Sequence, residues 1–173
     1  MPLSTRITSF AILIYVPLAA VALAWARLGQ DRLAWSLPSP WLSATYGVRL
    51  GVSLGLGLVL ALVVIAITPA LVERTAWARA LHQELKPIVD RLSSLEITLL
   101  ALTSGFAEEL FFRGAMQPVL GLLVTSIIFG AVHTGPKRVF LAWSIWAFIM
   151  GLLFGSIFEL TGVLWGPVLA HAL

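Results

Sequence analysis

Positions 50–72 read LGVSLGLGLVLALVVIAITPALV, and not one of these residues carries a charge. An α-helix rises about 1.5 Å per residue, so about 20 apolar residues are needed to cross a hydrocarbon core of about 30 Å. Three other uncharged runs reach this length, at residues 7–26, 114–136 and 139–158. These four runs predict four membrane-spanning helices.

Two further apolar runs bring the predicted number of membrane helices to about six. Residues 92–112 are long enough to cross but include Glu96, Glu108 and Glu109, and a last run begins near Gly162 and stops with the chain. The sequence is 60% hydrophobic and 11% charged, whereas soluble domains are about 45–50% apolar and about 25% charged. We therefore predict an all-α fold, a polytopic transmembrane helical bundle whose last helix is truncated.

The segment at residues 72–92 differs from these spans because apolar and charged residues are interleaved there. Leu81 and Leu85 stand one helical turn apart among several charged side chains. Such a pattern predicts an interfacial amphipathic helix. The chain then divides into an N-terminal region, residues 1–91, with two transmembrane helices and this surface helix, and a core at residues 92–173.

The basic residues favour one orientation in the membrane. The net charge is +3, but the basic residues lie in loops between the predicted spans. There, Lys and Arg set the topology and contact anionic lipid headgroups, so we predict lipid partners and no nucleic acid. The side of the N-terminus holds seven basic residues and the other side holds four: Arg6, Arg74, Arg79, Lys86, Arg91, Lys137 and Arg138 against Arg27, Arg32, Arg49 and Arg113. This difference predicts a cytoplasmic N-terminus.

The stretch that indicates chemistry is EELFFR at residues 108–113. Ionisable groups at membrane depth cost about 3 kcal/mol each, so they rarely occur there without a role. On a helix, Glu109 and Arg113 are four apart and can touch, whereas Glu108 points about 100° away. We predict that Arg113 neutralises Glu109 and leaves Glu108 free to act. The alternative is a structural Glu–Arg pair without chemistry.

Two histidines join these residues in a predicted site. His133 follows the apolar run at residues 126–132, and His171 lies in the last apolar run. Either one alone would be read as a hydrogen-bonded interior histidine. Together with the two carboxylates they form a constellation drawn from three helices, which is how helical bundles build sites.

With these motifs the sequence resembles the CPBP or CAAX-protease family of intramembrane glutamate proteases, which includes Rce1-type prenyl-protein proteases and the bacterial Abi proteins. Glu108-Glu109-x-x-x-Arg113 is similar to the family motif EExxxR, and Phe129-x-x-x-His133 is similar to FxxxH. His171 falls where the family has a polar residue followed four positions later by Asn or Asp. That later position would be 175, and the sequence ends at Leu173, so the last motif is incomplete.

The resemblance implies an endopeptidase in a bacterial plasma membrane, acting without cofactor or metal on a peptide or lipidated protein. CAAX-like, bacteriocin-related and sorting-tail peptides all remain open as substrates. Glu108 would be the general base, His133 would hold the attacking water, and His171 would donate to the developing oxyanion. Arg113 would hold Glu109.

Three other classes of protein stay open. The same Glu and His residues could serve a zinc metalloprotease, although the sequence has no His-Glu-x-x-His stretch. A serine protease would need Ser104 or Ser126 beside a histidine. A non-catalytic membrane scaffold, immunity-type protein or small transporter would need none of this chemistry. Because the sequence has no cysteine, cysteine nucleophiles and thiolate metal sites are excluded.

The predicted site also restricts where the chain can turn between Glu108 and His133. If the chain turned near Pro118, the distances from the turn to Glu108 and to His133 along their helices would differ by about 8 Å, at 1.5 Å per residue. A turn near Leu120 and Gly121 makes the two distances nearly equal. We therefore expect the helix that carries Glu108 to continue past Gly114.

Overall fold

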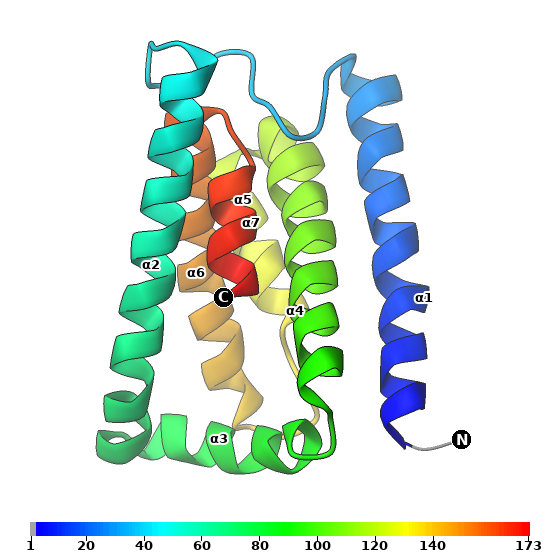
Figure 1. Ribbon diagram of the computed structural model, residues 1–173, viewed down its shortest axis with the longest axis vertical. Helices are drawn as coiled ribbons and strands as arrows, with labels where there is room; N and C mark the ends of the chain where they lie inside the picture. Colours follow the sequence, from blue (N-terminus) through cyan, green and yellow to red (C-terminus); the bar gives the residue numbers. More distant parts are fainter. Residues whose placement is uncertain (1–2) are drawn as a thin grey trace.

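The computed structural model describes the chain from residue 3 to residue 173, with the side chains of residue 9 and of residues 11–173. Its helices, in chain order, are α1 (Leu3–Ala24) with a π-helical end η1 (Trp25–Gly29), α2 (Tyr46–Arg74), α3 (Ala76–Val89), α4 (Ser94–Glu109), the π-helical η2 (Leu110–Met116), α5 (Gln117–Val132), α6 (Phe140–Thr161) and α7 (Trp165–Ala172). The long helices run side by side, and α3 lies across one end of them (Figure 1). The predicted all-α bundle is confirmed.

Four helical stretches in the described part of the chain are long and apolar enough to cross a membrane: Ala11–Gly29, Tyr46–Arg74, Ser94–Val132 and Phe140–Thr161. The protein is therefore an integral membrane protein. The number of such stretches is smaller than the six predicted. Arg6, which the topology prediction counts, lies outside the described side chains.

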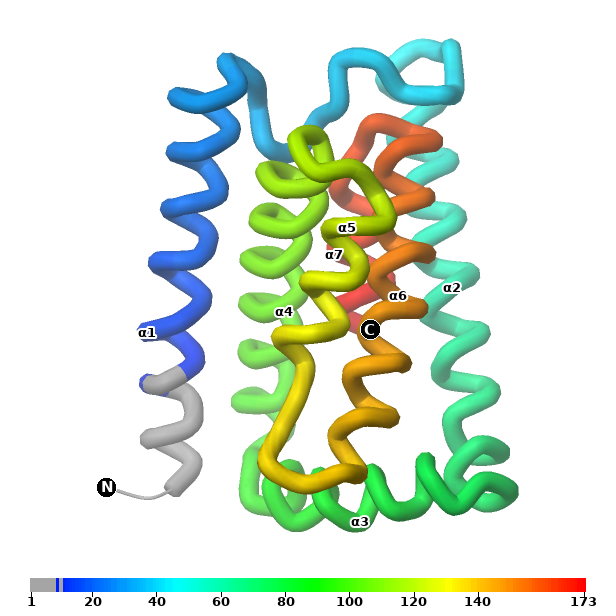
Figure 2. Tube along the Cα trace, turned by 180° about the vertical axis from the view of Figure 1, so that it is seen from behind, coloured from blue at the N-terminus to red at the C-terminus, as the bar shows by residue number. Residues whose placement is uncertain are grey.

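Two features account for the difference in number: the predicted spans at residues 92–112 and 114–136 fall in the one stretch Ser94–Val132, and α7 has only 8 residues. Within Ser94–Val132, the chain turns at Gly121. Its backbone has φ 78° and ψ 166°, which is not helical, and it divides the apolar run at residues 114–136. The chain rises through α4 and η2, turns over, and descends as α5 (Figure 2). The predicted single span at 114–136 is wrong, because glycine is apolar and hydropathy does not register the turn. The expectation that the helix of Glu108 continues past Gly114 is confirmed.

The predicted amphipathic helix is present as α3, with Ala78 and Leu81 buried. Pro87 lies inside it, near its C-terminal end. The Glu84 carboxylate of α3 accepts a 2.7 Å hydrogen bond from Lys137, which precedes α6. This contact connects α3 to the loop that follows His133.

The short helix α7 is held deep in the bundle by α2. The Ser53 hydroxyl donates to the carbonyl of Val163 at 2.9 Å and accepts from the Gly166 amide at 3.1 Å. A Cβ atom at Gly57 would overlap the backbone of Gly166. Gly51 and Gly55 of α2 also stand four residues apart, but nothing lies within 4 Å of a Cβ at either position.

Candidate active site

The helix that carries the two predicted carboxylates begins at a capping box. The Ser93 hydroxyl accepts from the Glu96 amide, and the Glu96 carboxylate accepts from the Ser93 amide at 2.8 Å. This arrangement satisfies donors that a helix start otherwise leaves unpaired. The Ser-x-x-Glu spacing is a sequence signal that we did not use. It explains Glu96 as a cap and separates it from Glu108 and Glu109.

Glu109 and Arg113 form the predicted pair. Arg113 Nη1 lies 3.0 Å from Glu109 Oε1, and both side chains have no exposed surface. Glu109 is the last residue of α4, and Arg113 lies within the π-helical segment η2. Because a buried charge without a partner is very costly, the loss of either side chain would leave the other as an uncompensated buried charge.

Arg113 is further enclosed by aromatic rings and by α6. Its guanidinium lies 4.2 Å from the ring centroid of Phe129 and 5.4 Å from that of Phe154. Its Nη2 donates to the carbonyl of Gly151 at 3.2 Å. A planar cation fits such a slot by stacking as well as by hydrogen bonding. Arg113 therefore acts as a buried structural cation that joins α4, α5 and α6.

His133 is the C-cap residue of α5 and takes its orientation from the residue one turn earlier. Its Nδ1–H donates to the carbonyl of Phe129 at 2.7 Å, and its ring lies 4.4 Å from the Phe129 ring between centroids. A carbonyl oxygen can only accept, so the proton is on Nδ1. In the neutral imidazole, Nε2 then carries a free lone pair.

His171 is positioned by Glu109 and by a stacked ring. Its Nδ1–H donates to Glu109 Oε1 at 2.8 Å, and its ring stacks on Phe154 with centroids 5.4 Å apart. Helix α7 reaches α4 because Gly105 lacks a side chain: a Cβ there would lie 3.3 Å from the Ala172 amide nitrogen. The contact between Glu109 and His171 was not predicted, since the sequence does not show which carboxylate a distant histidine meets.

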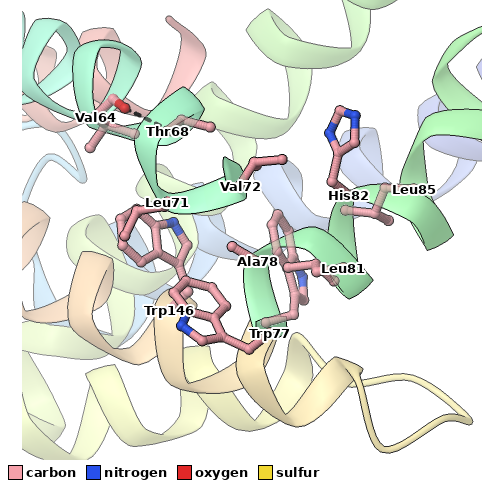
Figure 3. Close-up of a pocket in the computed structure, with 11 residues that line it drawn as sticks. Val64, Thr68, Leu71, Val72, Trp77, Ala78, Leu81, His82, Leu85 and Trp146 are labelled. Carbon is pink, nitrogen blue, oxygen red and sulfur yellow. Dashed lines mark hydrogen bonds between the residues drawn. The ribbon is translucent and has the colours of Figure 1, made fainter. Parts of the chain in front are cut away.

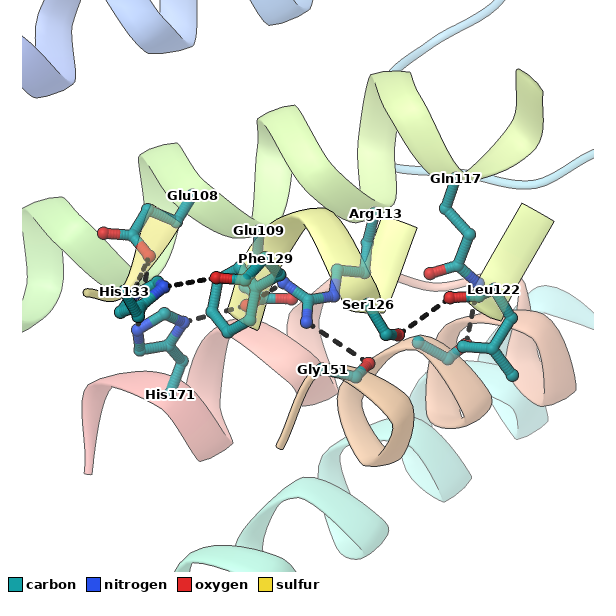
Figure 4. A network of polar contacts seen from close by, with 11 residues as sticks. Glu108, Glu109, Arg113, Gln117, Leu122, Ser126, Phe129, His133, Gly151 and His171 are labelled. Atoms are coloured by element: carbon teal, nitrogen blue, oxygen red, sulfur yellow. Dashed lines mark hydrogen bonds and ion pairs between the residues drawn. The ribbon is translucent and has the colours of Figure 1, made fainter. Parts of the chain in front are cut away.

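Both imidazoles present their free nitrogen to Glu108 (Figure 4). Glu108 Oε2 lies 3.4 Å from His133 Nε2 and 3.9 Å from His171 Nε2. Among the described residues, this oxygen has no hydrogen-bond partner although it is buried. All five predicted residues, Glu108, Glu109, Arg113, His133 and His171, thus lie together. Arg113 and His171 both contact Oε1 of Glu109, and its Oε2 has no hydrogen-bond partner among the described residues. Glu108 differs because its free oxygen faces two imidazole nitrogens.

Sequence reasoning missed a tyrosine on the first helix. The hydroxyl of Tyr15, in α1, interacts with the Glu108 carboxylate and with the side chain of Ser104. A tyrosine in an apolar span has no motif around it, so only the packing of α1 against α4 reveals it. Ser104 and Ser126, weighed as nucleophiles, hydrogen-bond to the carbonyls of Ala101 and Leu122 within their own helices, not to a histidine.

The described residues include no group of three or more His, Cys, Asp or Glu side chains in an arrangement that could hold a metal ion. Glu108, His133 and His171 lie close together: Nδ1 of each histidine is hydrogen-bonded, and the Nε2 atoms face the carboxylate. The arrangement consists of one carboxylate oxygen and two ring nitrogens around a common point. Such a set can accept and return protons.

The half of the chain that holds this site is similar to a known protein family. Residues 90–173 match the type II CAAX prenyl endopeptidase Rce1-like family. The chain is also 36% identical over 88 residues to the uncharacterized protein YpbD of Bacillus subtilis (strain 168). That alignment covers 50% of this chain and 45% of YpbD, so the chain spans less than half of this curated relative. No solved structure matches the chain significantly.

Proposed function

We propose, from the match of residues 90–173 to the Rce1-like family of CAAX prenyl endopeptidases, that this protein is an intramembrane endopeptidase using Glu108 as its general base. The family is one of peptidases, and the apolar helices place the chain in the membrane. The observation that carries the proposal is the unpartnered Glu108 oxygen facing two imidazole nitrogens on other helices.

In the first step Glu108 removes a proton from a water molecule while the oxygen of that water attacks the peptide carbonyl carbon. His133 Nε2 lies next to the same carboxylate oxygen, so it can accept this proton in turn. The proton passes to the nitrogen of the leaving amine when the carbon–nitrogen bond breaks. The products are a carboxylic acid, which keeps the second proton of the water, and an amine, and the enzyme returns to its starting protonation state.

His171 would stabilise the developing oxyanion in this scheme. Because its Nδ1 proton is donated to Glu109, it can donate from Nε2 only as the imidazolium. The Glu109 carboxylate, held by Arg113, is placed to stabilise that cation. Preorganised groups of this kind act without reorganisation cost in a dry site.

The proposed substrate is a peptide tail of a membrane-associated protein. The family description names CAAX prenyl endopeptidases, which favours a prenylated or CAAX-like C-terminal tail over bacteriocin-related or sorting-tail peptides. The site lies among membrane helices, so a lipid-anchored peptide can reach it from the bilayer.

The test is cleavage of a quenched fluorescent peptide with a prenylated cysteine near its C-terminus, by purified protein in liposomes. We expect cleavage that persists in excess EDTA. Loss of cleavage in EDTA, with zinc found in the purified protein, would support the metalloprotease instead. Absence of cleavage for prenylated, bacteriocin-derived and sorting-tail reporters alike would favour the non-catalytic scaffold or immunity-type protein.

A further inference from the structure

A large apolar groove lies on the face formed by α2, α3 and α6. It has a volume of about 870 Å³, and its lining includes Leu71, Trp77, Ala142, Ile145 and Trp146. A second pocket of about 220 Å³ shares Leu71, Trp77 and Trp146 with it. Figure 3 shows this second pocket, where α2 and α3 meet Trp146 of α6.

The groove is open to the hydrocarbon of the bilayer. Helices α2 and α6 both belong to stretches that are apolar enough to cross a membrane, and Ile145 is 54% exposed. The groove volume falls within the range of about 300–1,000 Å³ that is usual for ligand sites. Acyl chains are the apolar ligands present at that depth, and Trp77 and Trp146 are of the type that gathers at the headgroup level.

One charged side chain stands among these apolar residues, and it has no partner in the described part of the chain. Arg138 lines the groove just before α6, and it forms no ion pair or side-chain hydrogen bond. The preceding residue, Lys137, is by contrast paired with Glu84. A free guanidinium beside an apolar groove complements a phosphate attached to acyl chains.

We propose that this groove is a binding site for an anionic phospholipid. The headgroup phosphate is held by Arg138, and an acyl chain lies between α2 and α6 against Ala142 and Ile145. The lipid would fasten α3 to the bundle from the membrane side. This inference does not depend on the proposed peptidase activity.

The test is a titration of purified full-length protein with dioleoylphosphatidylglycerol or dioleoylphosphatidylcholine in detergent, followed by native mass spectrometry. One basic residue near the membrane surface corresponds to about a fivefold change in affinity. We expect the wild type to bind phosphatidylglycerol about fivefold more tightly than phosphatidylcholine. R138A should remove this preference, and A142F, which fills the groove, should weaken the binding of both lipids.

Arg91 provides the matched control, since it is exposed at the same end of the bundle and lines neither pocket. R91A removes the same charge and should bind both lipids like the wild type. Equal losses in R91A and R138A would show diffuse electrostatic attraction and overturn the proposal. So would a preference that survives R138A, or unchanged lipid binding in A142F when circular dichroism shows the variant folded.

Discussion

His133 Nε2 lies 3.4 Å from Glu108 Oε2, although His133 is the C-cap residue of α5 and Glu108 belongs to α4. The two helices run in opposite directions from the turn at Gly121 (Figure 2). Glu108 lies about 20 Å from this turn along its helix and His133 about 18 Å along the other, at 1.5 Å per residue. Because these two distances are nearly equal, the carboxylate and the imidazole lie at the same level along the bundle.

Gly121 should therefore tolerate no side chain. Its φ of 78° and ψ of 166° lie in a region that is essentially restricted to glycine, so G121A should cost about 1–3 kcal/mol of stability. It should also reduce cleavage, because the turn sets the depth of His133. Thermal unfolding in detergent and the cleavage rate measure both effects.

The matched control for that variant is G47A, at a helical glycine with nothing within 4 Å of a Cβ. It should unfold and cleave like the wild type. If G121A did the same, the turn would not be what places His133.

The two adjacent glutamates should respond differently to the same substitution. E109Q leaves Arg113 as a buried cation without a carboxylate, since both side chains are fully inaccessible, and should destabilise the fold by about 3–5 kcal/mol. E109Q would also remove the negative charge of the group that His171 contacts. The unfolding midpoint in detergent should fall clearly for E109Q and little for E108Q. Equal stability of the two variants would argue against the division of roles.

The sequence predicted the composition of this site better than its internal contacts. Spacing of four residues was enough to pair Glu109 with Arg113, because that geometry is local to one helix. Which carboxylate His171 meets depends on how α7 packs against α4 at Gly105, and no local pattern contains that information. The same holds for Tyr15, whose helix contacts α4 only in the folded bundle.

A matched pair of glycines in α2 tests the packing that positions α7. A Cβ at Gly57 would lie 2.8 Å from the backbone carbonyl carbon of Gly166, and one at Gly55 would meet nothing within 4 Å. G57V should destabilise the protein by about 1–3 kcal/mol through overpacking, and G55V should cost much less. The unfolding midpoints of the two variants in one detergent decide the matter. A larger loss in G55V would contradict the packing of α7 described above.

This pair also marks a limit of sequence reasoning for the fold. Gly51 and Gly55 have the spacing of a close helix contact, yet the contact is made by Gly57 with its neighbour Ser53. Small residues occur at several positions of α2, and their spacing alone does not say which face meets α7. Likewise, the apolar run at residues 114–136 was long enough for one span but contains the turn at Gly121.

The predicted cytoplasmic N-terminus requires α3 to lie on the cytoplasmic side, because α1 and α2 each cross the bundle once. The protein has no cysteine, so single cysteines can be introduced without background. Asp90 at the end of α3 and Ser43 before α2 are both exposed. In intact cells, an impermeant maleimide should label S43C and not D90C. The reverse pattern would invert the topology.

The central claim is that the Glu108 carboxylate activates water, and it is tested most directly by comparing cleavage rates of E108Q and E159Q in the same liposomes. Glu159 is a glutamate of α6 that accepts a hydrogen bond from Gln117, so E159Q controls for the loss of an intramembrane carboxylate. A general base contributes about 10²–10⁴-fold to a rate. We predict a loss of this size in E108Q, with a wild-type unfolding midpoint, and nearly full activity in E159Q. A folded E108Q variant that cleaves as fast as E159Q would contradict the account.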